Sequence, residues 1–110
     1  MPGTFEIFKD KAGEFRFRLK ATNGQIILAS EGYKVKSSCK NGIESVKKNS
    51  PDDKRYDRKT TTSGKFRFNL KAGNHQVIGT SESYESEKAR ENGIASIKKN
   101  APNAKLEDKS

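Results

Sequence analysis

The sequence predicts an α+β fold made by internal duplication, in which two copies of one unit each form three antiparallel strands followed by an amphipathic helix. Three observations predict it. The chain matches itself at an offset of 51 positions. Phe15–Lys20 alternates apolar and basic residues, as a half-buried strand does, and Cys39, Ile43 and Val46 recur at helical spacing.

The repeat covers most of the chain. When residues 13–52 are set against residues 64–103 without a gap, about half of the pairs are identical, whereas chance would give roughly two or three. The same offset sets Phe5-Glu6 against Tyr56-Asp57. The identical blocks include Phe15-Arg16-Phe17 with Phe66-Arg67-Phe68, Ser30-Glu31 with Ser81-Glu82, Tyr33 with Tyr84, Asn41-Gly42-Ile43 with Asn92-Gly93-Ile94, and Lys47-Lys48-Asn49 with Lys98-Lys99-Asn100.

Turn residues separate the expected strands. Asp10–Gly13 is turn-like, and Thr22-Asn23-Gly24 predicts a tight hairpin. The second unit has Gly73-Asn74-His75 at this place, for which we expect a looser turn. The strands are expected at Phe5–Lys9, Phe15–Lys20 and Gln25–Ala29, with Gln76–Thr80 as the counterpart of the third.

Each unit continues into a helix with one apolar stripe. The first helix is expected from about Lys36 to Lys48, and the stripe of the second contains Ala89, Gly93 and Ile97. The lysines of the last turn suit the negative end of a helix dipole, and a proline follows both helices.

Two details of the helices carry further expectations. Ser86 is the expected N-cap of the second helix, whereas Val35 stands at that position in the first and leaves its cap undefined. Gly42 and Gly93 lie in the middle of the helices, where glycine costs about 1 kcal/mol relative to alanine. Its presence twice predicts a close approach of the helix backbone to the sheet.

A unit this short buries too little surface to fold alone, so both helices should cover one face of a shared, mainly antiparallel sheet. We therefore expect one compact domain over residues 1–110, with repeats at 1–55 and 56–110. The segment Arg55–Lys59 follows the first helix and also begins the second unit as a strand. The tail Ala104–Asp108 is the expected matching final strand.

The composition is strongly basic. Lysine and arginine total 23 against 14 acidic residues, which gives a net charge of +9, and both repeats share the excess. Such a chain favours anionic partners such as nucleic acid or acidic proteins. The start of the chain resembles no signal peptide, no apolar run is long enough for a membrane span, and Cys39 is the only cysteine, so we expect a cytoplasmic protein that binds no membrane.

The repeated blocks resemble the YegP-like family of small uncharacterised bacterial proteins over nearly the whole chain. The motifs that carry this resemblance are Phe-Arg-Phe, Ser-Glu-x-Tyr and Asn-Gly-Ile-x-Ser-[Val/Ile]-Lys-Lys-Asn, each present twice. The resemblance implies a tandem β3-α-β arrangement in one sheet, with the C-terminal strand of each unit exchanged into the other. It implies no activity and no catalytic residues. The second copy departs from the pattern at Arg90-Glu91, which leaves the facing of its helix open.

Strand alternation places a band of basic residues on the face of the sheet opposite the helices. One interpretation is a phosphate-binding surface with Phe8 as a stacking group. The other is a solvated face whose arginines pair with Glu6 or Asp57 on the neighbouring strand. The candidate anion or nucleic-acid contacts are Arg16, Arg18, Lys20, Arg67 and Lys71.

Four other features have structural interpretations that compete with a functional one. Glu31 and Glu82 precede the helices and suit their positive ends, while Tyr33 and Tyr84 should bury their rings against the sheet. A catalytic pocket would have to unite Glu31, Tyr33 and Arg67. His75 reads as a turn residue and Cys39 as a small core residue, and Asp52-Asp53 lies in a charged, exposed linker.

No nucleophile triad, glycine-rich phosphate loop or metal-ligand spacing is present in the sequence. We therefore expect neither a cofactor nor a metal, and no enzyme. The expected function is that of a small, basic, monomeric binding module for nucleic acid or another anionic partner. The alternative is a protein-interaction or structural module that acts through its sheet edges.

Overall fold

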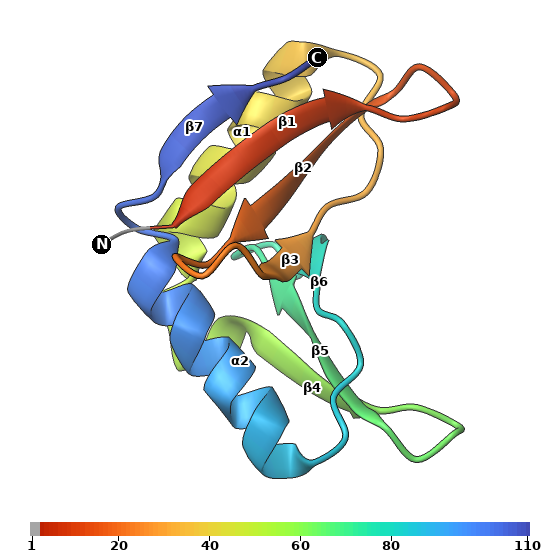
Figure 1. Cartoon of the computed structure of the whole chain (residues 1–110), viewed down its shortest axis with the longest axis vertical. Helices are drawn as coiled ribbons and strands as arrows, with labels where there is room; N and C mark the ends of the chain where they lie inside the picture. The colour runs from red at the N-terminus through yellow and green to blue at the C-terminus, as the bar shows by residue number, and fades with distance from the viewer. Residues whose placement is uncertain (1–2) are drawn as a thin grey trace.

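A computed structural model describes residues 3–110 and confirms the α+β fold (Figure 1). Each repeat contributes three strands and one helix of 14 residues, and a seventh strand ends the fold. The elements are β1 (Thr4–Lys9), β2 (Phe15–Lys20), β3 (Ile26–Ala29), α1 (Lys36–Asn49), a 3-10 turn at Asp53–Arg55, β4 (Tyr56–Thr60), β5 (Phe66–Lys71), β6 (Val77–Thr80), α2 (Glu87–Asn100) and β7 (Lys105–Asp108).

The strands form one sheet in the order β4-β5-β6-β3-β2-β1-β7, in which only the β1–β7 pair is parallel. The two repeats meet where β3 pairs with β6, through Ala29 and Thr80. These two residues occupy equivalent positions in the repeats. The sheet therefore has an approximate two-fold axis at this pair.

The strands that follow the two helices lie in the half of the sheet built by the other repeat, as the family resemblance implies. After α1 the chain enters β4, which pairs with β5 of the second repeat. After α2 it enters β7, which pairs with β1 of the first repeat, and the ladder continues from Lys109 N–H to the Ile7 carbonyl at 2.8 Å. The arrangement is not fully symmetric: β1 occupies the place beside β2 that β4 has beside β5, so β7 lies outside β1.

Both helices pack on the same face of the sheet and share one core. Each helix contacts strands of both repeats, α1 with β2, β5 and β6, and α2 with β3 and β5. The core contains side chains from both halves, including Phe17, Ile43, Phe68 and Ile94. Neither repeat buries its apolar face without the other.

The extra strand β7 explains the departure at Arg90-Glu91. Because β7 covers β1, Ile7 is fully buried. The equivalent position on the edge strand β4 is Arg58, whose guanidinium binds both carboxylate oxygens of Glu91 at 2.9 Å. Arg90 lies over the ring of Phe66. Helix α2 therefore turns the same side toward the sheet as α1 does. It carries polar residues near β4, which has no further strand beside it.

The mid-helix glycines allow tyrosine rings to approach closely. A Cβ atom at Gly42 would lie 2.6 Å from the hydroxyl oxygen of Tyr33, and one at Gly93 would lie 2.7 Å from Cζ of Tyr84. The expected close approach is confirmed, but it involves rings from the loop before each helix, stacked on Phe17 and Phe68 of the sheet.

The expectation of a looser second turn is wrong. Both turns close with the same hydrogen bond, from Gly24 N–H to Ala21 and from His75 N–H to Ala72, at 2.9 Å each. His75 adopts a φ of 69°, the left-handed region that Gly24 occupies at 84°. The turn therefore keeps its shape although the glycine has been replaced.

Helix capping differs between the repeats as the sequence predicts. The Ser86 hydroxyl accepts a hydrogen bond from Ala89 N–H at 3.1 Å, whereas Val35 caps α1 without a side-chain bond and is 55% exposed. Val35→Ser should therefore raise the free energy of unfolding by about 0.5–1 kcal/mol, and the reverse control Ser86→Val should lower it by about 1 kcal/mol. Urea unfolding of the two variants measures both. Destabilisation by Val35→Ser would contradict the cap assignment.

A second asymmetry lies on the two-fold axis itself. Leu28 and Gly79 are equivalent residues, and the Leu28 side chain fills the space beside Gly79. A Cβ atom at Gly79 would lie 2.7 Å from Cγ of Leu28. The axis has room for one large side chain, and the first repeat supplies it.

This geometry predicts a rescue between two positions. Leu28→Gly should cost about 3–5 kcal/mol through lost burial, and Gly79→Leu should destabilise the fold by overpacking. In the double variant the leucine occupies the other side of the axis, so it should be more stable than either single variant. Denaturant unfolding of all four proteins gives the coupling energy, expected to be about 1–3 kcal/mol. Additive losses would show that the two side chains do not compete for one space.

Candidate functional site

The open face of the sheet carries the basic residues that the sequence places there. Strand register aligns Arg18 with Glu6 on β1 and with Ala29 on β3, and Ala29 with Thr80 on β6. The row continues through Asn69 to Asp57 on β4. One carboxylate therefore lies near each end of the row, at equivalent positions of the two repeats.

Glu6 is the centre of the first half of this face. Its side chain is only 4% exposed, and its oxygens contact Nε of Arg18 at 2.8 Å, Nζ of Lys109 at 3.0 Å and Nζ of Lys20 at 3.2 Å. Burial alone would raise the pKa of Glu6, but the hydrogen bonds from these three cations outweigh it and hold the pKa at about 2. Glu6 is thus an ionised carboxylate surrounded by excess positive charge.

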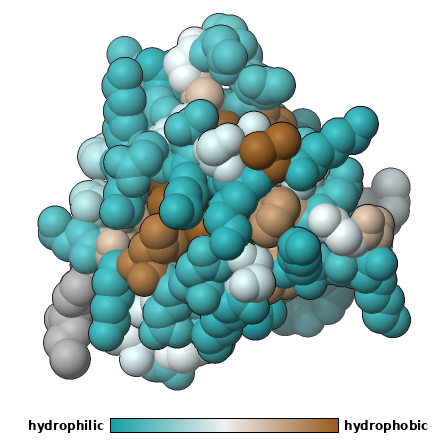
Figure 2. Space-filling model, turned by 90° about the horizontal axis from the view of Figure 1, so that it is seen from above, coloured by the Kyte–Doolittle hydropathy of each residue, from teal (hydrophilic) through white to brown (hydrophobic). Residues whose placement is uncertain are grey.

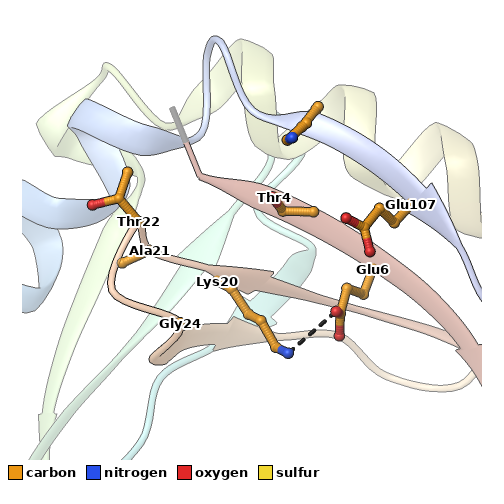
Figure 3. Close-up of a pocket in the computed structure, with 8 residues that line it drawn as sticks. Thr4, Glu6, Lys20, Ala21, Thr22, Gly24 and Glu107 are labelled. Carbon is orange, nitrogen blue, oxygen red and sulfur yellow. Dashed lines mark ion pairs between the residues drawn. The ribbon is translucent and has the colours of Figure 1, made fainter. Parts of the chain in front are cut away.

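A shallow pocket of about 310 Å³ opens beside Glu6 (Figure 3). Its walls come from β1, the end of β2 with the following turn, and β7. In Figure 3, Lys20 reaches across from β2 to Glu6, and Glu107 lies beside Glu6 on the neighbouring strand. Lys105 also lines the pocket and makes no ion pair within residues 3–110.

The second half of the face repeats this arrangement with weaker pairing. Asp57 contacts Nζ of Lys59 at 3.2 Å and Nζ of Lys71 at 3.3 Å. Burial would raise the pKa of Asp57, but these hydrogen bonds lower it on balance. Asn69 stands where the first repeat has Arg18, so Asp57 has no arginine partner among the residues described.

Arg16 and Arg67 are equivalent residues in different environments. Asp10 binds Arg16 Nε at 2.6 Å, and in the second repeat Thr61 aligns with Asp10. Arg67 consequently has no carboxylate partner in the described part of the chain, and its buried Nε donates no hydrogen bond there. Oδ1 of Asn69, two residues along the same face, likewise accepts none. This half of the face has unused hydrogen-bonding groups.

The ion pairs confirm that carboxylates bind much of the basic band, yet they do not neutralise the face. Its cations exceed its carboxylates by a wide margin, even when the turn residue Asp10 is included. The cations are Arg16, Arg18, Lys20, Lys59, Arg67, Lys71, Lys105 and Lys109, and the strand carboxylates are Glu6, Asp57 and Glu107. Lys59, Lys105 and Lys109 were missed by the sequence reasoning, although strand alternation from Asp57 could have identified Lys59.

The face offers little for base stacking. The ring of Phe8 is covered by the guanidinium of Arg18, 4.7 Å from the ring centroid. The exposed large hydrophobic residues within residues 3–110 are Val35 and Leu106. Figure 2, which shows the molecule from above the view of Figure 1, has hydrophobic residues on this side only in small areas between hydrophilic ones.

The other candidate residues are buried in the fold or lie too far apart to form a site together. Cys39 is fully buried, and burial raises the pKa of its thiol to about 11. Tyr33 packs on the helix side of the sheet, so it cannot join Arg67, which belongs to the open face. Glu31 and Glu82 make no ion pair in the described chain. Within residues 3–110, no group of three or more His, Cys, Asp or Glu residues is placed to hold a metal, and no helix is long and apolar enough to cross a membrane.

The sequence pattern of a domain of unknown function, DUF1508, matches residues 10–57 and again residues 62–108. A UPF0339 protein from the 5′ region of the ptx operon of Stutzerimonas stutzeri is 71% identical over 96% of both chains. The UPF0339 protein YegP of Escherichia coli K12 is 51% identical over 98% of both chains.

Two solution NMR structures have the same fold. That of Escherichia coli YegP, a protein of unknown function, superposes with a TM-score of 0.94 at 50% identity, covering 99% of this chain and 94% of that one. That of a UPF0339 protein from Shewanella oneidensis gives 0.92 at 48% identity, covering 98% and 92%. These relatives confirm the resemblance and the fold, and their descriptions name no activity.

The low pKa of Glu6 predicts a pH-dependent contribution to stability. Since its folded pKa of about 2 lies below the ordinary value of 4.5, the contribution is full above about pH 4.5 and is lost as the pH falls toward 2. Glu6→Gln should therefore lower the free energy of unfolding by about 1–3 kcal/mol at pH 7, and by progressively less below pH 4.5. Urea unfolding at a series of pH values measures this. Glu82→Gln serves as the control. If the free energy of unfolding lost in Glu6→Gln stayed the same at every pH, the low pKa of Glu6 would be refuted.

Proposed function

This chain belongs to the UPF0339 family of proteins with two DUF1508 repeats, and we propose that it is a non-enzymatic module that binds nucleic acid through the open face of its sheet. The observation that carries this proposal is the excess of cations on a face that no helix covers. The proposed contacts include Arg16, Arg18, Lys20, Arg67 and Lys71, together with Lys59 and Lys105. The protein would act as a cytoplasmic monomer.

The charge distribution supports a backbone contact. Phosphates of nucleic acid are singly charged and regularly spaced, and lysine and arginine bind them by releasing condensed counterions. Arg67 lacks a carboxylate partner within the described residues, so it can bind a phosphate without first breaking an ion pair. Arg18 and Lys20 are ion-paired with Glu6, so a phosphate that contacts either of them competes with this carboxylate.

The described face has no free aromatic ring on which a base could stack, so we expect little specificity for base sequence. Phe8 is occupied by Arg18, so stacking of bases contributes little. Binding should therefore depend on phosphates more than on sequence, and it should fall steeply as salt rises.

Two matched double variants test the location of this surface. Arg67→Gln/Lys105→Gln removes two cations from the open face, and Lys40→Gln/Lys88→Gln removes two exposed cations from the helices, so both lower the net charge equally. The open-face variant should weaken binding to a mixed-sequence duplex about tenfold or more at low salt and reduce the salt slope by about 2. At physiological salt, where exposed charges are screened beyond about 8 Å, the helix variant should change affinity less than about twofold. Fluorescence anisotropy between low and physiological salt measures both.

Equal losses in the two double variants would reduce the binding to general charge attraction and overturn the proposal. So would a partner that stays bound after nuclease treatment and at high salt, because that result favours a protein partner. The outer edge of β7, whose four residues are all exposed, is where such a partner could add a strand.

A further inference from the structure

Two equivalent pockets lie beside the helices, and the turn residues Ala21 and Thr22 line both the α2 pocket and the pocket beside Glu6. One, of about 390 Å³, lies between α1 and the turn that joins β5 to β6. The other, of about 360 Å³, lies between α2 and the turn that joins β2 to β3. Each pocket is therefore built from the helix of one repeat and the hairpin of the other. Five residues that line the first pocket have an equivalent in the second. They are Ser45, Lys48, Asn49, Ala72 and Asn74 in the first pocket, and Ser96, Lys99, Asn100, Ala21 and Asn23 in the second.

The helix side of each pocket is held in the same way. The amide nitrogen of Asn49 donates to the Ser45 carbonyl at 2.8 Å and to the Ser45 hydroxyl at 3.2 Å. Asn100 makes the same pair of bonds to Ser96, at 2.7 Å and 3.2 Å. Both asparagines are buried. The serine hydroxyl oxygen thus accepts a hydrogen bond and leaves its own proton for another partner.

The turn side of each pocket also offers free hydrogen-bond donors. The side-chain oxygen of Asn74 accepts from Gln76 N–H at 3.0 Å, and that of Asn23 accepts from Gln25 N–H at 3.0 Å. The amide NH₂ group of each asparagine is left unbonded within residues 3–110. The turn asparagine oxygens and the serine hydroxyl oxygens accept these hydrogen bonds, whereas the serine hydroxyl protons and the turn amide NH₂ groups make no hydrogen bond within residues 3–110.

Lys48 and Lys99 add a charged donor to the hydrogen-bond donors of the two pockets. Neither lysine makes an ion pair or a side-chain hydrogen bond in the described chain, although each follows a lysine that does. A serine hydroxyl, an asparagine amide and a lysine ammonium therefore converge on each pocket with their protons unused. Such a set of donors fits an oxyanion with several acceptor oxygens.

We propose that these pockets are two equivalent binding sites for a phosphate group, carried by inorganic phosphate or by a small phosphate monoester. The helix C-terminus opposes an anion, and in each pocket one lysine of the last turn, Lys48 or Lys99, offsets it. Arg55 adds a second cation to the pocket of α1, although its Nε also contacts Asp52 Oδ2 at 3.5 Å, so we expect this site to bind somewhat more tightly than the site at α2.

The test is a titration of the isotope-labelled full chain with inorganic phosphate and, separately, with a nucleoside 5′-monophosphate, at constant ionic strength held with chloride. Amide signals of Ser45 and Asn74, and of Ser96 and Asn23, should shift with saturation, earlier for the α1 pocket. Signals of the open-face residues Arg67 and Lys105 should not follow the same curve. Saturation with the monophosphate alone would still support the sites and identify the monoester as the ligand.

The variants Lys48→Gln and Lys99→Gln change exposed or half-exposed side chains and should leave the fold intact. Each should weaken phosphate binding about tenfold at its own pocket and leave the other pocket unchanged. Arg67→Gln/Lys105→Gln should leave both pockets unchanged, which separates this inference from the nucleic-acid proposal. Absence of saturation with either ligand, or equal shifts over the whole surface, would overturn it and leave the lysines as cations at a helix end.

Discussion

The pairing of β3 with β6 is the constraint on which the rest of the structure depends. Within residues 3–110 it is the one place where the two halves of the sheet meet, and it involves a single pair of equivalent residues, Ala29 and Thr80. So short a contact cannot by itself hold two half-sheets in register. The helices complete it, because each packs on strands of both repeats, and Leu28 fills the axis beside Gly79. One core and one open face follow from this junction.

The open face shows how a basic protein accommodates its charge near a sheet. Glu6 and Asp57 occupy equivalent positions and divide the cations into two groups. The groups are unequal, since Asp10 and Arg18 in the first repeat correspond to Thr61 and Asn69 in the second. The first half is therefore ordered by ion pairs, and the second retains donors and acceptors that the described chain does not satisfy. Duplication supplied the pattern, and divergence made the halves chemically different.

Most of the fold could be predicted from the sequence because the pattern of each strand and helix occurs in both repeats. Alternation in Phe15–Lys20 and the spacing of Cys39, Ile43 and Val46 were sufficient for the strand and the helix. The shape of the turn at His75 could not be predicted, since a non-glycine residue rarely adopts a positive φ. The ion pair of Glu6 with Lys109 and the two pockets beside the helices depend on contacts between distant elements, for which periodicity contains no signal.

The position of β7 outside β1 has a consequence for how the protein is made. β1 leaves the ribosome before β7, and its outer edge has no β7 partner until residues 105–108 have emerged. Lys109 reaches Glu6 only at the same stage. The nascent chain thus carries an exposed strand edge until β7 emerges, and ordering by long-range contacts of this kind is slow. The charged residues Glu6 and Lys9 of β1 then act as protection, because charged edge strands resist pairing with the strands of other chains.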